Sequence, residues 1–589
     1  MSHTESKLGD FTTDSRVLLL SLMAIGIGCL SAFVAYILLW LIAVITNISF
    51  FGRFSADPVI PAQTHLGWWI ILIPAAGGLI IGLMARYGSD KIRGHGIPEA
   101  LEAILLGQSR IEAKVAILKP LSSAISIGTG GPFGAEGPII MTGGACGSLI
   151  AQMFHMSSAE RKTLLAAGAA GGMAAVFGTP VAAVLLAVEL LLFEWKPRSL
   201  IPVAFASMAA AIMRVPLLGP GPIFPVIPHG SLNAVGLCFA GLVGLIAGFG
   251  AGIVTKMVYG FEDLFPRLKV HWMWWPLIGG VFVGIGGVID PRVLGVGYGT
   301  IHMLLNGQIL GTAALSLLLA KSVVWSLSLG SGTSGGVLAP LLMIGGTIGA
   351  FAGQYIPVGS PGLWAMVGMA AMMGGTMRAP FTAIIFSLEL TYDIRILPAL
   401  LIACIASELV SILWLKRSIL TEKVARRGHH LSCEYSVDPF EIHRVGEIMI
   451  TRYCFMSPTS PVRHLEDPSF PASQWFTERR TIPVVDADKH IIGVITQADF
   501  MRAAESEEGL SMTAADVASH DFATISEDEV VREAVAKLLS TNIESLLVTS
   551  EEEPDKMVGY VDRSTTIEAH QRWYAEEHVR ESRWSFSAQ

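Results

Sequence analysis

The stretch Lys119–Gln152 reads KPLSSAISIGTGGPFGAEGPIIMTGGACGSLIAQ, and a similar stretch returns later in the chain. Lys321–Gln354 reads KSVVWSLSLGSGTSGGVLAPLLMIGGTIGAFAGQ, with a constant spacing of 202 residues that also relates Pro138 to Pro340. Two similar halves in one chain are a common plan of membrane transporters, whose substrate sites lie where broken helices of both halves meet. The repeat therefore predicts a polytopic α-helical membrane protein of two inverted repeats with broken helices.

The similarity extends to both sides of this stretch. Residues 177–190 (FGTPVAAVLLAVEL) match residues 377–390 (MRAPFTAIIFSLEL), and Gly94-x-Gly96 matches Gly295-x-Gly297. We place the two repeats at roughly 60–215 and 260–420, since repeats of this kind continue through whole helices.

The composition separates the chain into two parts. Apolar residues make up 52% of the 589 residues and charged residues only 15%, which is typical of packed membrane helices. Uncharged runs of about the length of a bilayer span occur at 17–51, 66–85, 163–188, 231–255 and 272–289. Residues 426–589, in contrast, hold 29 of the 48 acidic residues and 16 of the 40 basic residues. This imbalance predicts an acidic soluble tail behind a membrane domain.

Three loops share one pattern, in which glycines precede a proline that opens an apolar run: GHGIPE at 94–99, GAEGP at 134–138 and GGVLAP at 335–340. Proline is favoured in the first turn of a helix, and glycine lets backbone or ligand approach closely. The free N–H groups and the positive dipole end of such a helix attract anions. Partial charges hold an anion weakly enough for it to leave again, so the loops predict a pathway for small anions.

Glu136 is an acidic residue inside the second of these loops. Intramembrane acids are functional candidates by default. Beside helix N-termini, a carboxylate can occupy the anion site itself, and protonation would release it and open the path. We therefore predict that Glu136 gates the pathway, with simple compensation of a helix dipole as the alternative.

These motifs resemble those of the CLC family of chloride channels and chloride/proton antiporters, over roughly residues 15–426 and the tail. GHGIPEA resembles the family's GSGIP loop, GAEGP its G[KR]EGP loop and GGVLAP its GxFxP loop, and Lys119 matches a basic residue 17 positions before the gating glutamate. The resemblance implies a multi-pass protein of the cell or inner membrane that carries chloride or a similar anion. It also implies a homodimer with one pathway per subunit and anion-binding positions at His95, Gly96, Ile97, Pro98, Gly134, Gly137, Gly336, Val337, Leu338 and Leu420.

Two of these positions depart from the family pattern. His95 replaces a serine whose hydroxyl the family uses at its anion site, and Leu420 replaces a tyrosine near the end of the membrane domain. Both side-chain hydroxyls are missing, so backbone amides would hold the anion. His95 is either an additional ligand or a packing residue.

The sequence around Pro180 bears on proton coupling. CLC antiporters commonly carry an inner glutamate ten residues after this proline, but here Glu189 stands at the ninth place and Leu190 at the tenth. The missing acid favours a pathway like that of a voltage-gated chloride channel, or a loosely coupled exchanger. Proton-coupled antiport stays open as an alternative, because water, Glu194 or His95 could relay protons. Lys119, Glu189 and Leu190 are the candidate residues for a proton path or for electrostatic tuning.

The tail holds two similar units at 445–505 and 512–572, each with a helical stretch, an apolar strand, a turn and a second strand. They resemble a tandem CBS-domain pair, which implies either an adenine nucleotide at Thr496 and Asp499 or a purely dimerising role. Basic residues beside the last membrane run place the tail in the cytoplasm. The remaining segments are a cytoplasmic N-terminal segment at 1–16, the membrane domain at 17–426, a linker at 427–444 and a C-terminal tail at 573–589.

Rival functions find less support. A CBS-bearing membrane metalloprotease would need an H-E-x-x-H motif, which this sequence does not contain. A divalent-cation channel would want acidic side chains along its pore, whereas the motifs here offer glycine N–H groups and one key acid, Glu136. We therefore expect neither an enzyme nor a metal site, and no nucleic-acid partner.

Overall fold

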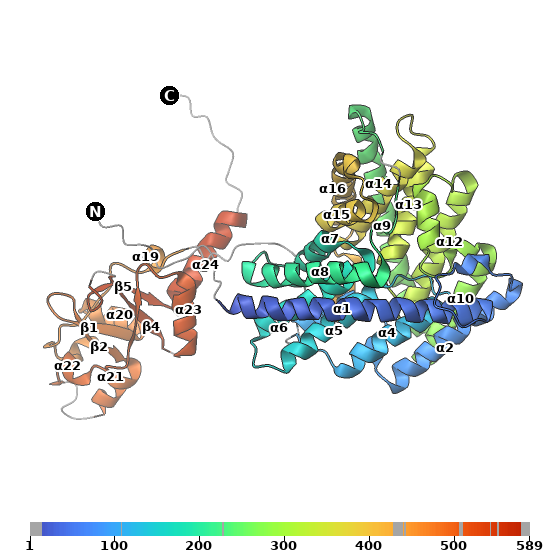
Figure 1. The fold of residues 1–589 in the computed structure, drawn as a ribbon. Helices are drawn as coiled ribbons and strands as arrows, with labels where there is room; N and C mark the ends of the chain where they lie inside the picture. The colour runs from blue at the N-terminus through green and yellow to red at the C-terminus, as the bar shows by residue number, and fades with distance from the viewer. Residues whose placement is uncertain are drawn as a thin grey trace, which may run out of the picture. The chain divides into compact units, whose positions relative to one another are not determined.

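The computed structural model divides the chain into two compact units, Met1–Glu434 and Tyr435–Gln589. It describes residues 15–105, 107, 109–226, 229–427, 440, 443–505, 511–541, 543–550 and 553–578. Most of the predicted segments at 1–16, 427–444 and 573–589 therefore lies outside the described residues. The two units are the membrane unit and the tail unit, and each is described by itself (Figure 1).

The first half of the membrane unit contains the helices α1 to α8. Their bounds are α1 Arg16–Thr46, α2 Leu72–Tyr87, α3 Ile97–Leu105, α4 Ala113–Gly128, α5 Glu136–Gln152, α6 Ser158–Phe177, α7 Pro180–Leu186 and α8 Pro197–Leu218. A π-helical stretch, Ala187–Leu192, continues α7. Several of these helices are too short to cross a bilayer, as the glycine and proline interruptions predicted.

The second half contains the helices α9 to α16, followed by the short helix α17. Their bounds are α9 Ala234–Leu264, α10 Trp275–Ile289, α11 Tyr298–Leu305, α12 Gly311–Gly330, α13 Leu338–Gly353, α14 Pro361–Met377, α15 Pro380–Thr391, α16 Leu397–Trp414 and α17 Ile419–Arg426. Helix order and helix lengths thus follow those of the first half. In Figure 1 most first-half helices, coloured blue to teal, lie below those of the second half, while α10 lies beside α2 and α7 beside α15, on which they pack.

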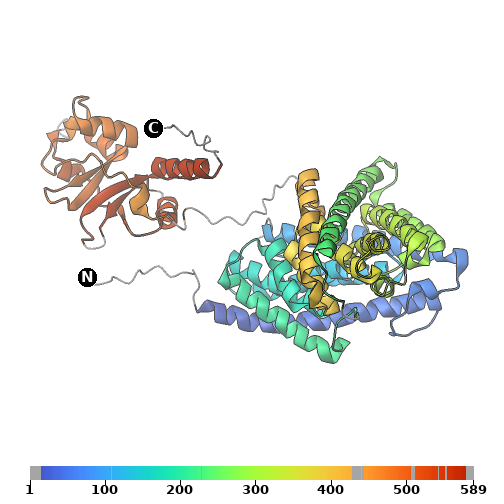
Figure 2. The same ribbon diagram turned by 90° about the horizontal axis from the view of Figure 1, so that it is seen from above.

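Both halves pack in the same way. Helix α5 packs on α6 as α13 packs on α14, and α1 packs on α8 as α9 packs on α16. The pairing of α1 with α8 is visible in Figures 1 and 2, where the two helices run side by side. The repeats therefore begin at α1 and α9, so the predicted ranges 60–215 and 260–420 start too late. These two helices are evenly apolar and carry no motif that would have revealed their place in the repeat.

Seven stretches of the described residues are long and apolar enough to cross a membrane: Arg16–Phe51, Gly67–Tyr87, Pro197–Leu218, Ala234–Arg267, Trp272–Ile289, Gly311–Gly330 and Ile394–Arg426. Helices α5, α6, α13 and α14 instead bury nearly all of their side chains. Close packing explains their glycine content, since a Cβ on Gly143 or Gly168 would collide with the other residue's carbonyl group. The same contact recurs between Gly345 and Gly368 in the second half.

The tail unit is a small α/β structure with two sheets. Strands β1 (Thr481–Val485) and β2 (Ile491–Thr496) form an antiparallel pair, while β4 (Ser545–Thr549) lies between β3 (Ala523–Ser526), parallel to it, and β5 (Met557–Asp562), antiparallel to it. The helices are α19 Val445–Ile448, α20 Pro471–Arg479, α21 Gln497–Ala504, α22 Ala514–Val517, α23 Val531–Ser540 and α24 Arg563–His578. The boundary predicted between 572 and 573 falls inside α24, because that helix continues past the last apolar residue that marked the unit.

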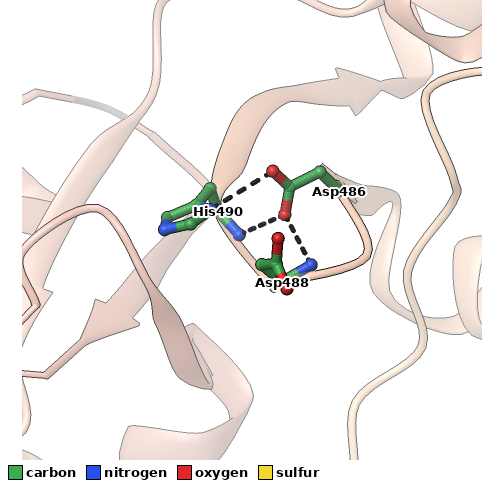
Figure 3. A group of neighbouring side chains, drawn as sticks. All are labelled: Asp486, Asp488 and His490. Carbon is green, nitrogen blue, oxygen red and sulfur yellow. Dashed lines mark hydrogen bonds and ion pairs between the residues drawn. The ribbon is translucent and has the colours of Figure 1, made fainter.

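The turn between β1 and β2 gathers Asp486, Asp488 and His490 (Figure 3). The backbone N–H groups of Asp488 and His490 donate to Asp486 Oδ1 at 2.9 and 2.8 Å, and the His490 ring lies 3.2 Å from Asp486 Oδ2. An aspartate that accepts backbone N–H groups two to four residues later is a common way to stabilise a tight turn. The arrangement is therefore explained by the hairpin itself.

Candidate anion pathway

The three glycine-rich loops meet directly in the middle of the membrane unit. Gly336 N–H donates to the Gly134 carbonyl at 2.9 Å, and Gly134 N–H donates back to the Gly336 carbonyl at 3.4 Å. Gly335 N–H contacts the Gly94 carbonyl at 3.5 Å, which joins the first loop to the other two. The structure thus brings together the N-termini of α5 and α13, one from each half, as the repeat predicted. Reciprocal contacts of this kind are the signature of a twofold relation between the halves.

Glycine is required where these loops touch. A Cβ at Gly96 would lie 2.6 Å from the Gly137 carbonyl oxygen, and a Cβ at Gly137 would strike the His95 carbonyl group. A Cβ at Gly336 would lie 2.6 Å from the Gly134 carbonyl oxygen. The backbone amides of three helix starts can approach one another only because no side chain separates them.

Glu136 is the first residue of α5 and is completely buried. Its Oε1 accepts a hydrogen bond from Ala339 N–H at 2.5 Å, in the first turn of α13, while its Oε2 has no hydrogen-bond partner among the described residues. The carboxylate of one half therefore occupies the N-terminus of the broken helix of the other half. A charge-assisted hydrogen bond and the helix dipole both favour a negative charge at this point.

The residues Val337 and Leu338 form the end of the third loop and the start of α13, and both are fully buried. In the first loop, Ile97 and Pro98 open α3 and are buried as well. Gly96 N–H is already engaged, because it donates to Glu99 Oε2 at 2.8 Å. The amide that the first loop was expected to offer to an anion is thus occupied by a carboxylate of the protein.

Glu99 is a residue that the sequence analysis did not single out. Its Oε1 accepts a hydrogen bond from Lys423 Nζ on α17 at 2.7 Å, and Arg427 lies 3.8 Å away. The side chains of Glu99 and Lys423 are only 6% and 16% exposed. An acid three residues after the N-terminus of a helix is the familiar signal for a helix cap, but the partner on α17 lies 324 residues away.

His95 is buried, with 3% of its surface exposed, and its Nδ1 has no hydrogen-bond partner among the described residues. It lines a cavity of about 280 Å³ together with Arg93, Tyr259, Lys423 and other residues. Leu420 is fully buried in the apolar core of the membrane unit. Next to it, the carbonyl of Ile419 accepts a hydrogen bond from the Tyr259 hydroxyl at 2.5 Å. The cavity therefore brings His95 close to the cationic side chains of Arg93, Lys423 and Arg427.

The comparisons with known proteins agree with this geometry. A family profile described as voltage gated chloride channel matches residues 77–412, more than half of the chain. The chain belongs to this CLC family. Two CBS domains match residues 445–506 and 514–571. The helical membrane unit, its CLC fold and the small α/β tail are thereby confirmed.

Relatives of both functional types are similar to this CLC protein. The voltage-gated ClC-type chloride channel ClcB of Citrobacter koseri is 30% identical over 373 residues, which cover 61% of this chain and 88% of the relative. The H(+)/Cl(−) exchange transporter ClcA of Salmonella arizonae is 28% identical over 419 residues, which cover 68% and 86%. The crystal structure of a slow cyanobacterial Cl⁻/H⁺ antiporter superposes with a TM-score of 0.62 at 22% identity, covering 71% of this chain and 99% of that one.

Two buried lysines of this CLC protein donate hydrogen bonds to backbone carbonyls of equivalent loops in the two halves. Lys119 Nζ donates to the carbonyls of Ile92 and Gly94 at 2.8 and 2.6 Å. Lys321 Nζ donates to the carbonyls of Val293 and Gly295 at 2.9 and 3.4 Å, in the corresponding loop of the second half. Both side chains are fully buried. Lys119, a candidate for electrostatic tuning, thus holds the backbone of the first loop.

Glu189 and Glu389 cap each other's helices across the two halves. Glu189 Oε2 accepts hydrogen bonds from Thr382 N–H at 2.9 Å and from its hydroxyl at 2.6 Å, at the start of α15. Glu389 accepts from the N–H groups of Val181 at 3.0 Å and Ala182 at 2.8 Å, at the start of α7. The carboxylate of Glu189 is therefore engaged as a helix cap. The neighbouring Leu190 is buried, with 5% of its surface exposed.

Thr496 and Asp499 lie at the start of α21 in the tail unit, directly after β2. The Thr496 hydroxyl donates to Asp499 Oδ2 at 2.6 Å, and Arg502 contacts Asp499 Oδ1 at 2.6 Å. The two side chains thus form a capping box with each other. Their predicted contact with a nucleotide stays a prediction.

In the second CBS domain, Asp562 ends strand β5 as Thr496 ends strand β2 in the first domain. Arg479 of the first domain donates to Asp562 Oδ2 at 2.8 Å, and Thr565 donates to Oδ1 from its N–H and its hydroxyl, both at 2.8 Å. Burial by itself would raise the pKa of Asp562, but hydrogen bonds from Ser564, Arg479 and Thr565 bring the pKa below its ordinary value. The Asp562 carboxylate therefore joins the two CBS domains.

Proposed function

We propose that this CLC protein moves chloride or a similar small monovalent anion across a membrane, through a pathway gated by Glu136. The observation that carries the proposal is the place of the Glu136 carboxylate on the N-terminus of α13. The N–H groups at the start of α13, Ala339 N–H among them, would hold an anion at the same place once the carboxylate has left. An anion held by partial charges alone can be released again, as transport requires.

Protonation of Glu136 is the event that opens this pathway. A neutral carboxyl group loses most of its attraction to the dipole of α13 and to Ala339 N–H, so an anion can replace it. Glu136→Gln imitates the protonated state and should give an anion flux that no longer depends on pH. Radiotracer chloride efflux from proteoliposomes measures this directly. A mutant that keeps the normal pH dependence would refute the role of Glu136.

We favour uncoupled, channel-like conduction over coupled exchange. Leu190 is apolar and the carboxylate of Glu189 caps α15, so neither offers a free carboxylate for protons from the cytoplasmic side. Proton-coupled exchange is the second candidate, since one of the similar relatives carries the name of an exchanger. The reversal potential under a pH gradient at fixed chloride decides between them. A channel ignores the gradient, while a reversal potential that shifts in proportion to it establishes exchange.

The protein acts as a homodimer in this proposal, with its tail in the cytoplasm. The carboxylates of Glu189 and Glu389 lie beside the exposed side chains of Val181 and Phe381, which are 52% and 56% exposed. Carboxylates that face lipid are costly, so a second copy is the better cover for this face. Crosslinking of a cysteine placed at Phe381 tests the arrangement, because only a symmetric contact at this face gives a covalent dimer.

The CBS pair is proposed to bind an adenine nucleotide through Thr496 and Asp499. The two side chains stand at the N-terminus of α21, where the positive end of the helix dipole favours a phosphate group. Titration of the full-length protein with ATP, ADP and AMP, followed by calorimetry, measures the binding. If none of them binds, dimerisation is the better account of the tail.

A further inference from the structure

The second half contains its own version of the first anion loop. Residues 94–97 read GHGI and residues 295–298 read GVGY. The two buried lysines fix this register, since Lys119 holds the carbonyls of residues 92 and 94, and Lys321 holds those of 293 and 295. Tyr298 therefore stands where the first half has the apolar Ile97.

Tyr298 opens helix α11 and points its ring into an aromatic cluster. The ring packs edge-on against Phe177 and Phe224, with centroid distances of 6.4 and 5.8 Å. Its hydroxyl is buried and has no hydrogen-bond partner among the described residues. A buried hydroxyl without a partner is costly, so its presence in this apolar cluster requires an explanation.

The Glu136 carboxylate offers an explanation for the buried hydroxyl of Tyr298. Its Oε2 is another buried polar atom without a hydrogen-bond partner among the described residues. An electrostatic interaction couples the Tyr298 hydroxyl to the Glu136 carboxylate. Lys321 is the charged side chain that also acts on Glu136. Tyr298 opens α11, and α11 packs on α13, whose N-terminus holds the Glu136 carboxylate, so an unused donor and an unused acceptor lie in the same buried region.

We propose that Tyr298 is a positioning residue for the gate, whose hydroxyl donates a hydrogen bond to Oε2 of the ionised Glu136 side chain. The proposal rests on the proposed function of Glu136. The two groups are not hydrogen-bonded to each other in this structure, so the proposed bond requires a rotation of the Glu136 side chain. Tyr298 would then supply from the second half a side-chain hydroxyl, the kind of group that His95 and Leu420 do not offer.

The expected consequence is a change in the pH at which the gate opens. A hydrogen bond to the ionised carboxylate favours that form, and its loss makes protonation easier. Tyr298→Phe should therefore open the pathway at higher pH, and a tenfold change in proton affinity corresponds to a shift of about one pH unit. The substitution removes only the hydroxyl and keeps the ring that packs against Phe177 and Phe224.

The experiment is chloride efflux from proteoliposomes measured from pH 4 to pH 9, on the full-length protein. Tyr355→Phe is the matched control, because Tyr355 is 75% exposed and also makes an edge-on aromatic contact, with Phe351. We expect the midpoint of the pH profile to rise in Tyr298→Phe and to stay unchanged in Tyr355→Phe. In a Glu136→Gln background, Tyr298→Phe should have no further effect.

Three results are distinguishable. An unshifted midpoint in Tyr298→Phe overturns the inference, even if Glu136→Gln abolishes the pH dependence as proposed. An equal change of flux in the Glu136→Gln background also overturns it, because Tyr298 would then act without the carboxylate. A Glu136→Gln protein with normal pH gating refutes the proposed function itself, and with it the inference.

Discussion

Gly336→Ala tests whether anion transport requires the two helix N-termini to touch through their backbones. Gly336 N–H donates to the Gly134 carbonyl at 2.9 Å. A Cβ at position 336 would lie 2.6 Å from that carbonyl oxygen and 3.0 Å from Cδ of Glu136. Real Cβ atoms do not come this close to backbone, so the two loops must move apart.

The magnitude follows from the cost of overpacking. An additional methyl group in a well-packed interior costs about 1–3 kcal/mol. At 1.4 kcal/mol for each factor of ten, this corresponds to a roughly 5- to 150-fold loss. The strain falls on the amides that would bind the anion and on the carboxylate that closes the path. We therefore expect the anion flux to fall by about this factor.

The assay is chloride efflux from proteoliposomes at the pH of maximal wild-type flux. Gly144→Ala is the matched control on α5, because its Cβ would lie 3.3 Å from the nearest atom, in the flexible side chain of Leu165. Symmetrical elution of both variants from a sizing column shows that they are folded. If Gly336→Ala transported at the wild-type rate, the direct contact of the loops would not be needed for transport.

Two further predictions concern ion pairs. Lys423→Met removes the nearest cation of the buried Glu99 carboxylate, leaving Arg427 at 3.8 Å, and should lower the stability of the detergent-solubilised protein by about 3 kcal/mol. Lys91→Met, which breaks an exposed pair of similar length, should cost less than about 1 kcal/mol in the same thermal melts; equal costs would show that burial does not matter here. In the tail, the pKa of Asp562 is lower in the folded protein than in the unfolded chain. The ionised Asp562 side chain therefore stabilises the fold fully above the unfolded-chain pKa of about 3.9. This stabilisation is lost as the pH falls through the lower pKa of the folded protein. Asp562→Asn, which weakens the contact with Arg479, should flatten the acid destabilisation of the tail below about pH 4. An unchanged acid-unfolding profile by circular dichroism would contradict that assignment.

Much of the candidate site can be predicted from local sequence patterns. Glycine followed by proline marks each helix start, and the acid Glu136 in the second loop marks the proposed gate, because both features reflect what backbone and bilayer allow at one place. The constant spacing between the halves then predicts that the loops belong to one pathway. In the structure the loops do meet, since Gly134 contacts Gly336 and Gly94 contacts Gly335.

Other parts of the site depend on pairings that sequence spacing does not reveal. Glu99 meets Lys423 from 324 residues away, and Glu389 caps a helix 207 residues earlier in the chain. Which side chains meet over such distances is decided by the packing of whole helices. The extent of the repeats was misjudged for the same reason, because α1 and α9 reveal their equivalence only through their contacts with α8 and α16.

The amino-acid sequence alone therefore determined the membrane class, the doubled plan, the three helix starts and Glu136, because composition, periodicity and turn chemistry are properties of neighbouring residues. Only the tertiary structure decided which amides are free and which are occupied. Gly96 N–H is bound by Glu99, the α13 N-terminus is bound by Glu136, and the Tyr298 hydroxyl has no partner within the described part of the chain. Hydrogen-bond partners are settled by the arrangement of helices in space, since each donor bonds to whichever acceptor the fold brings within reach.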